Sequence, residues 1–389
     1  MGGKVQTGIE CLVRDPIKLG TAKRIGLITN QTGVTAILDS TISVLRKLLG
    51  NRIVALFGPE HGLYGHIQDR ERIGDGTDRD TGLPVHSLYG PKESPAGEVL
   101  REIDLLIFDI QDVGVRFYTF LTSLIYTLKA AAAAGIPVMV LDRPNPITGM
   151  RVQGPLVQPD LRSFEGASSI PIRHGMTLGE LALLLNRTED IGAEIEVAFM
   201  TGWRRTMWYE DTGLQWVPPS PNMPTVDTAV VYPGLCLFEG TNISEGRGTT
   251  RPFELIGAPW MVSSQLAEAL NDRQMPGIRF RPATFRPTFW KLKDCTCHGV
   301  QIHVMDRGNF DPLYVSLSMM SQILELWPNE IEWTKVAGDP QFFFDRLIGN
   351  HTVRKDLMDG VRPSEITDGF LEAESMFRDL SLPFLHYDN

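Results

Sequence analysis

The stretch DLLIFDIQDVGVRFYTFLTSLIYTLKAAAAAGIPVMVLD, residues 104–142, decides the fold. Its first apolar run, Asp104–Ile110, predicts a buried strand, and the segment Thr119–Ala134 predicts a long helix. Gly135 stands where a left-handed helix C-cap belongs, and a proline two residues later prevents the helix from continuing. Val138–Asp142 then predicts a second strand. Strand, helix and strand of continuous aliphatic character indicate a βαβ unit with parallel, buried strands.

The alternation of strand and helix patterns continues on both sides of this stretch. Aliphatic and β-branched runs predict further strands at Ile25–Asn30, Ile53–Gly58, Val85–Leu88 and Ile195–Met200. Apolar residues at helical spacing predict helices at Ile37–Leu49 and Leu178–Asn186, and the second helix opens with the capping box Thr177-Leu-Gly-Glu180. The Pro- and Gly-rich stretch Arg143–Ser169 predicts a long functional loop.

The pattern loosens over residues 201–258, which contain several clusters of turn-forming residues. Beyond them, helices and a strand are predicted at Ser264–Asn271, Gly299–Val304 and Pro312–Trp327. A chain of 389 residues exceeds the roughly 250–300 residues that one hydrophobic core organises. We therefore expect an α/β domain in residues 1–235, with a mostly parallel sheet and helices on both faces. A smaller α+β domain in residues 236–389 is expected to close a cleft against it.

The composition is that of a globular protein, with 42% hydrophobic and 22% charged residues. The net charge of −10 argues against a nucleic-acid partner, whose phosphates need a basic face. No apolar run reaches the roughly 18–20 residues that span a bilayer, so no membrane span is expected. The four cysteines are scattered and are interpreted as reduced thiols or small core residues. Nothing in the sequence indicates an oligomeric state.

The opening MGGKVQTGIECLV has neither the charged region nor the apolar region of a secretory signal. A cytoplasmic location is therefore expected for the sequence as it stands. Export, with the leader already removed, is the alternative.

Polar clusters follow four of the predicted strands. These clusters are Asn30–Gly33, Pro59–Gly62, Gln111–Tyr118 and Asp142–Pro146. Each one alone is weak evidence, because Asp, Asn, Gly and Pro are ordinary turn residues. Ligands of open α/β sheets bind outside the carboxyl ends of the strands, and four such clusters on one rim therefore predict a site there.

Common cofactor motifs are absent from the sequence. No G-x-G-x-x-G follows the first strand, which disfavours an NAD-dependent oxidoreductase, and no phosphate loop, H-E-x-x-H or G-x-S-x-G occurs. His61, His66 and Asp69 lie close together in one loop and could hold a metal, but hydrogen-bonded loop histidines are the favoured interpretation. We therefore expect neither a cofactor nor a metal.

Carboxylates, arginines, amides and aromatic residues remain, and these are the side chains that process a sugar. Glu60 is the best candidate acid or base, because it directly follows a buried strand in a turn fixed by Pro59 and Gly62. The competing interpretation is a carboxylate that binds loop amides. Glu239 and Glu245, in a Gly-rich loop that permits close ligand approach, are the best second carboxylates.

Two further acids and one arginine have weaker interpretations. Asp109 lies inside an apolar strand and is interpreted as a structural acid, and Asp142 could form an ion pair with Arg143. Arg247 could hold a substrate carboxylate in a bidentate fork or could bind Glu245 and loop carbonyls.

Long motifs along the chain resemble those of one known family. They are GLITNQTG (26–33), LFGPEHGLYG (56–65), FDIQDVGVRFYT (108–119), LDRPNP (141–146), IRHGMTLGELA (172–182), PSPNMPT (219–225), YPGLCLFEGTNISEGRGTT (232–250) and PFELIGAPW (252–260). The chain resembles the bacterial exo-β-N-acetylmuramidases from about Thr7 to the last helical region. The resemblance implies a Rossmann-like N-terminal domain, a smaller C-terminal domain and a cleft between them. It also implies release of N-acetylmuramic acid from the non-reducing end of peptidoglycan fragments, without a nucleotide or redox cofactor.

The resemblance also implies a set of site residues. The glutamate of the Pro-Glu-His-Gly motif, here Glu60, is the implied catalytic residue. Other residues in matching motifs are expected to line the cleft, namely His61, Asp112, Arg116, Tyr118, Asp142, Asn145, His174, Asn222, Glu239, Asn242, Glu245 and Arg247. Muramic acid carries a lactyl carboxylate, for which Arg247 is the expected partner and Arg116 the reserve.

Several alternatives stay open at this point. A non-catalytic protein that binds cell-wall sugar on the same fold is the main one, because fold does not fix function. The sequence does not distinguish inversion from retention, and it does not show whether bare or peptide-bearing glycan is preferred.

Overall fold

The computed structural model describes residues 4–68, 71, 73–90 and 93–388. Within these residues, seven strands form one sheet in the order β3-β4-β2-β1-β5-β6-β7. All neighbouring strands of this sheet pair in parallel except β3 and β4. The strands are β1 (Ile25–Thr29), β2 (Ile53–Gly58), β3 (Gly76–Thr77), β4 (Pro84–Ser87), β5 (Leu105–Asp109), β6 (Val138–Leu141) and β7 (Ile195–Ala198). The predicted α/β class with a mostly parallel sheet is confirmed.

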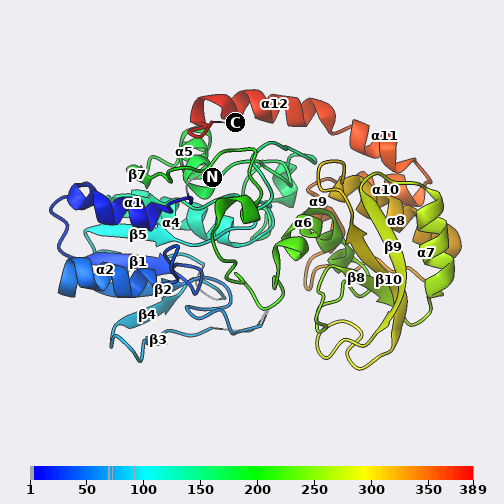
Figure 1. Cartoon of the computed structure of the whole chain (residues 1–389), viewed down its shortest axis with the longest axis horizontal. Helices are drawn as coiled ribbons and strands as arrows, with labels where there is room; N and C mark the ends of the chain where they lie inside the picture. The colour runs from blue at the N-terminus through cyan, green and yellow to red at the C-terminus, as the bar shows by residue number, and fades with distance from the viewer. Residues whose placement is uncertain (1–3, 69–70, 72, 91–92, 389) are drawn as a thin grey trace.

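Helices cover both faces of this sheet (Figure 1). Successive side chains of a strand point to opposite faces, and the core follows this rule. In β5, Leu105 and Ile107 pack with α1 and α2, whereas Leu106 and Phe108 pack with α4 and α5. The continuous aliphatic strands of the sequence are therefore buried on both sides. The helices of this part are α1 (Gly8–Arg14), α2 (Thr41–Leu49), α3 (Gly97–Leu100), α4 (Phe120–Ala134) and α5 (Leu178–Thr188).

The strand order reverses between β1 and β5. The chain moves from β1 outward to β2 and β4, and then returns to place β5 on the other side of β1. Ligands bind at such a switch point, outside the carboxyl ends of the strands. The turns after β1, β2 and β5 therefore lie together at this switch point, on the rim where the sequence predicted a site.

The second part of the chain is smaller and is built on an antiparallel sheet. Among the described residues, three strands pair in the order β8-β10-β9. They are β8 (Leu255–Ala258), β9 (Ile278–Phe285) and β10 (Cys297–Val304). The helices around this sheet are α6 (Val226–Leu235), α7 (Ser263–Asp272), α8 (Pro312–Leu326), α9 (Phe343–Ile348), α10 (Val353–Met358) and α11 (Pro363–Asp368). Along the described chain, no helix is long and apolar enough to cross a membrane.

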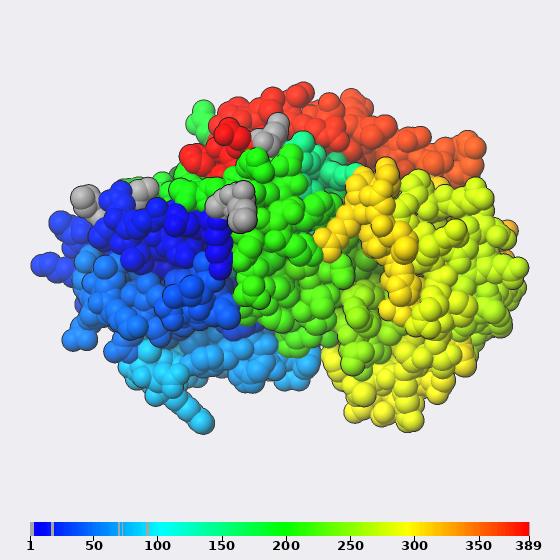
Figure 2. Space-filling model, viewed as in Figure 1, coloured from blue at the N-terminus to red at the C-terminus, as the bar shows by residue number. Residues whose placement is uncertain are grey.

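The end of the chain returns to the first part. Helix α12 (Leu371–Ser381) lies across the top of the molecule and brings the C-terminus back beside α5 (Figures 1 and 2). There the Tyr387 hydroxyl donates to Asp142 Oδ2, and the His386 amide donates to Glu180 Oε1 at 2.9 Å. The His386 ring also stacks on Phe199 with 3.6 Å between the ring centroids. The last residues thus fasten the second part to the sheet of the first.

Two differences from the sequence predictions have clear physical causes. The helix predicted at Ile37–Leu49 is α2, which begins at Thr41 because Ser40 caps it by accepting a hydrogen bond from the Ser43 amide. Helix α6 lies within residues 201–258, where the sequence showed clusters of turn-forming residues and no helix was predicted, and it contains Pro233 and Gly234. A Cβ at Gly234 would lie 1.8 Å from the Pro312 carbonyl oxygen, so this glycine permits close packing of α6 on α8.

Candidate active site

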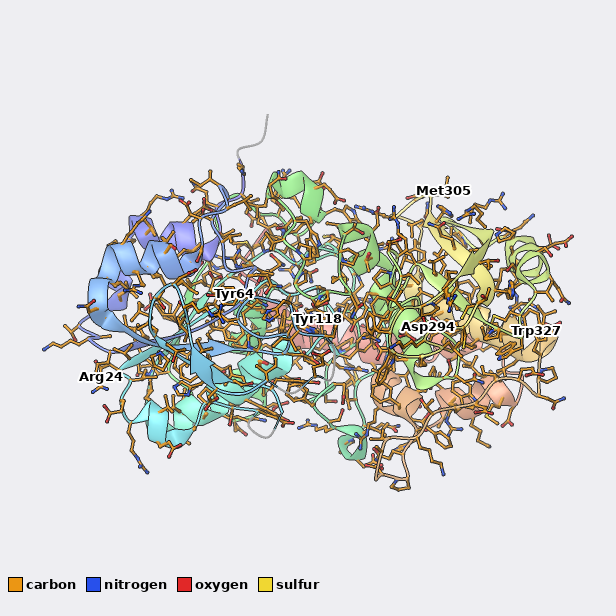
Figure 3. All side chains as sticks on the ribbon, turned by 90° about the horizontal axis from the view of Figure 1, so that it is seen from below. Arg24, Tyr64, Tyr118, Asp294, Met305 and Trp327 are labelled. Carbon is orange, nitrogen blue, oxygen red and sulfur yellow. The ribbon has the colours of Figure 1, made fainter. Side chains whose placement is uncertain are left out.

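A cleft of about 460 Å³ lies where the two parts of the chain meet. Its first wall comes from the turn after β2, the connection from β5 to α4, and the segment around residues 220–223. Its second wall comes from α6, the Gly-rich loop that follows it, and the segments near residues 290 and 334–347. Tyr118, which lines the cleft, lies between the two halves of the molecule (Figure 3).

Glu60 lies in this cleft at the carboxyl end of β2, and 5% of the residue is exposed. The turn that presents it is closed by a hydrogen bond of 2.9 Å from the Gly62 amide to the Pro59 carbonyl. The Thr119 hydroxyl donates to Glu60 Oε2 at 2.6 Å. Thr119 is also the N-cap of α4, whose positive dipole end favours a nearby carboxylate. Two segments that lie about sixty residues apart thus orient one carboxyl group.

Four charged side chains cluster at the opposite wall, and we call them the charge quartet. Three of them line the cleft, namely Glu239, Arg247 and Lys291, and the fourth is Glu245. Arg247 Nη1 lies 2.5 Å from Glu239 Oε1 and 3.3 Å from Glu245 Oε1. Lys291 Nζ lies 2.8 Å from Glu245 Oε2 and donates to the carbonyl oxygens of Phe238, Thr241 and Ile243. The two positive and two negative charges of the quartet balance.

The structure separates the two carboxylates that were predicted as catalytic partners of Glu60. Glu239 lines the cleft and also accepts a hydrogen bond of 3.0 Å from the Cys236 thiol. Glu245 is 1% exposed and lies behind Arg247 and Lys291, so it does not line the cleft. Burial alone would raise the pKa of Glu245, but Lys291 and Arg247 outweigh burial and hold this pKa below its ordinary value. The structure therefore places Glu245 as the anchor of the quartet, away from the cleft surface where the catalytic prediction would need it.

Asp112, Tyr118 and His174 form a buried polar group beside Glu60. Asp112 Oδ2 accepts a hydrogen bond of 2.6 Å from the Gly114 amide and lies 3.9 Å from His174 Nε2. Burial raises the pKa of Asp112 to about 7, and burial lowers the pKa of His174 to about 3. The His174 ring is therefore neutral, and its Nδ1 accepts a hydrogen bond from the Met176 amide. Of the three residues, Tyr118 lines the cleft, and Asp112 and His174 lie behind it.

The raised pKa of Asp112 predicts a pH-dependent stability. The folded protein holds this proton more tightly than the unfolded chain, since the pKa rises from 3.8 to about 7. The contribution of Asp112 to stability therefore falls as pH rises through this window, by about 1.4 kcal/mol per pH unit. We expect Asp112→Asn to gain stability relative to the wild type between pH 5 and 7. Denaturant unfolding of both proteins at pH 5, 6 and 7 measures this, and parallel pH profiles would contradict it.

Four residues that were expected to line the cleft hold the structure together instead. Asp142 is fully buried and accepts hydrogen bonds from Thr177 Oγ1 and the Gly179 amide, and burial raises its pKa to about 6. The other three bind main-chain groups away from the cleft, and they are Arg116, Asn145 and Asn242. The suggested ion pair between Asp142 and Arg143 is also wrong, because Arg143 Nε lies 2.6 Å from Asp109 Oδ1. That contact confirms Asp109 as a structural acid.

Arg116 joins the two parts of the chain. Its guanidinium donates to the carbonyl oxygens of Pro155 and Ile170 in the first part, and to that of Leu347 in α9, at 2.7–2.8 Å. Burial lowers the pKa of Arg116 to about 9. Arg116 is 1% exposed and does not line the cleft, so the structure favours a structural role over that of reserve partner of the lactyl carboxylate.

We expect Arg116→Met to destabilise the protein by roughly 3–5 kcal/mol, because hydrogen bonds to a charged group are lost and buried carbonyls stay unpaired. Thermal unfolding followed by circular dichroism measures the loss. In the protein that remains folded, KM should match that of the wild type. A raised KM at unchanged stability would restore a substrate-binding role.

His61 and Asn222 lie in the cleft as predicted. His61 has the left-handed backbone angle φ 70°, and its Nδ1 lies 2.9 Å from the Ile67 carbonyl oxygen. Asn222 Nδ2 donates to Gln68 Oε1 at 3.4 Å. Within the described residues, no group of three or more His, Cys, Asp and Glu side chains could hold a metal ion, and Asp69 lies outside those residues.

Several cleft residues were missed by the sequence interpretation. Tyr89 and Phe164 form a ring pair with 5.8 Å between centroids at the first wall. The second wall adds Trp290, the segment 334–337 and residues of α9. Aromatic residues are more often core than ligand contacts, so composition alone could not select these positions. The residues of the second wall face those of the first only when the second part of the chain packs on the first.

Comparisons with known proteins agree with this architecture. Family models described as the N-terminal and C-terminal parts of the exo-β-N-acetylmuramidase NamZ match residues 25–227 and 230–387. The peptidoglycan β-N-acetylmuramidase NamZ of Bacillus subtilis (strain 168) is 46% identical over 384 residues, which cover 99% of this chain and 92% of that protein. Two crystal structures of DUF1343 family proteins from Bacteroides fragilis are also similar. One has a TM-score of 0.89 at 35% identity over 99% of both chains, and the other has 0.77 at 30% over 100% of both.

Proposed function

The chain belongs to the exo-β-N-acetylmuramidase NamZ family, and from this membership we propose that it releases N-acetylmuramic acid from the non-reducing end of peptidoglycan fragments. In this proposal it is a glycoside hydrolase in which Glu60 acts as the general acid. The observation that carries the proposal is the position of Glu60, which lies at a strand end in the cleft between the two parts of the chain.

The surroundings of Glu60 support the role of an acid. A general acid must protonate the leaving glycosidic oxygen, which requires a carboxyl group that is held in one orientation and shielded from bulk water. The Thr119 hydroxyl holds Glu60 Oε2, and the residue is buried except for its cleft side.

Glu239 is the second carboxylate of the proposal. Arg247 Nη1 lies 2.5 Å from Glu239 Oε1, and the Cys236 thiol donates to the same oxygen. An ionised carboxylate across the cleft can stabilise the positive charge that develops on the sugar in the transition state. The aromatic side chains of the cleft, among them Tyr89 and Phe164, offer faces for sugar rings.

The test is hydrolysis of para-nitrophenyl β-N-acetylmuraminide beside the N-acetylglucosamine analogue, which lacks the lactyl group. Release of nitrophenol from the first substrate alone is the expected result. If the folded protein releases nitrophenol from neither substrate but binds N-acetylmuramic acid, it is a sugar-binding protein and the proposal fails.

A further inference from the structure

Within the described part of the chain, four cationic side chains line the cleft, and three of them are already bound to carboxylates. Arg247 binds Glu239 and Glu245, and Lys291 binds Glu245. Arg346 of α9 binds Asp339, and its Nε donates to Gln341 at 2.9 Å. The fourth cation is Lys335.

Lys335 has a different environment from the other three. Among the described residues, no carboxylate lies within ion-pair distance of its ammonium group, whose Nζ is 5.5 Å from the centre of the Phe342 ring. The residue is exposed, so its charge stays hydrated and is available to a ligand. A lysine ammonium on a flexible stem acts as a point charge that can follow a carboxylate.

The segment that carries Lys335 is held in place at both ends. The Thr334 amide donates to the Gly240 carbonyl at 2.9 Å, directly beside Glu239. The chain then turns back, and the Val336 amide donates to the Gln341 carbonyl at 3.0 Å. Gln341 Nε2 in turn donates to the Asp160 carbonyl of the first part at 2.8 Å. The hairpin 334–343 therefore connects both parts of the chain, and Lys335 lines the cleft from it.

We propose that Lys335 binds the lactyl carboxylate of the N-acetylmuramic acid residue and so determines specificity for this sugar. This inference rests on the proposed function and replaces Arg247 as the expected partner of that carboxylate. A third carboxylate beside Arg247 would face Glu239 and Glu245, whose charges already balance those of Arg247 and Lys291. At Lys335, the substrate carboxylate meets a positive charge that no side chain has neutralised.

The test varies the charge of the enzyme and of the substrate together. The substrates are para-nitrophenyl β-N-acetylmuraminide and its lactyl methyl ester, which differ by one negative charge. For Lys335→Met, we expect kcat/KM on the acid to fall on the order of 10- to 100-fold, as for loss of a charge-assisted hydrogen bond, and kcat/KM on the ester to stay unchanged. Lys335→Arg should retain most of the activity. Lys47→Met, on the exposed surface of α2, is the matched control and should change neither rate.

The outcomes separate this inference from the proposed function. Equal losses on acid and ester, or no loss on either, would overturn the role of Lys335 while the glycosidase stands. If the wild type hydrolyses neither substrate, the proposed function fails. The role of Lys335 is then tested by calorimetry, which measures the dissociation constant of free N-acetylmuramic acid for the wild type and for Lys335→Met. An unchanged dissociation constant in Lys335→Met then overturns the inference. A 10- to 100-fold weaker one, with N-acetylglucosamine binding unaffected, supports it.

Discussion

Replacing Glu60 by glutamine should lower kcat on a glycan substrate by about 10³-fold or more, near the upper range for loss of a general acid. Glutamine keeps the shape of the side chain and can still accept the hydrogen bond from Thr119. It cannot deliver a proton to the leaving oxygen. KM and the thermal midpoint should stay close to those of the wild type, because neither substrate contacts nor packing are removed.

Two variants serve as controls for this result. Thr119→Val removes the hydrogen bond that orients Glu60 but leaves the acid in place, so a smaller loss of about 10-fold is expected. Glu102→Gln alters a carboxylate whose side chain is 63% exposed, and it should have no effect. A Glu60→Gln enzyme with wild-type kcat would remove Glu60 from the catalytic role and leave it as a loop anchor.

The second large effect is expected on stability, at Lys291 in the charge quartet. Lys291→Met leaves Glu245 buried with one cation fewer and removes the donor of the Thr241 and Ile243 carbonyls. The Phe238 carbonyl loses the same donor but still accepts from the amide and the hydroxyl of Thr241. Breaking a buried ion pair by removal of one partner costs roughly 3–5 kcal/mol. Chemical denaturation followed by tryptophan fluorescence measures the change. Lys293→Met is the matched control, because Lys293 is exposed and lies only two residues away.

A double variant tests the cause of this loss. Adding Glu245→Gln to Lys291→Met removes the unpaired charge, so the double variant should be less destabilised than the sum of the two single variants. Because the pKa of Glu245 is held below its ordinary value, the stabilisation by the quartet should be lost as pH falls through that pKa. The account would be contradicted if the changes in unfolding free energy of the two single variants simply added in the double variant. Equal losses of stability for Lys291→Met and Lys293→Met would also contradict it, because the quartet would then not stabilise this wall.

The sheet could be predicted from sequence because its strands are short aliphatic runs with clear boundaries. The predicted strand Ile53–Gly58 matches β2, and Gly135 adopts the left-handed C-cap conformation expected of it. Helix α6 could not be predicted, because its proline and glycine are ordinarily helix breakers, and this glycine is explained only by the close approach of α8. Strand β9 contains Pro282, which is tolerated because β9 is an edge strand.

The site likewise contains residues that could be predicted from the sequence and residues that could not. Glu60 could be found from sequence, because a polar residue directly after a buried parallel strand must lie at the ligand-binding rim. The roles of Glu245 and Arg116 could not, because they depend on Lys291 and on the carbonyl of Leu347, which lie far away in the sequence. Lys335 was missed for the same reason, since no local pattern indicates that its hairpin faces the cleft.

The central claim is tested most directly by comparing the rates at which the Glu60→Gln variant cleaves two substrates that differ in their leaving group. A 2,4-dinitrophenyl leaving group departs without protonation, whereas the sugar of a peptidoglycan disaccharide requires it. If Glu60 is the general acid, the variant should cleave the dinitrophenyl muraminide at a rate within about 10-fold of the wild type and lose about 10³-fold on the disaccharide. Equal losses on both substrates would contradict the assignment of Glu60 as the proton donor.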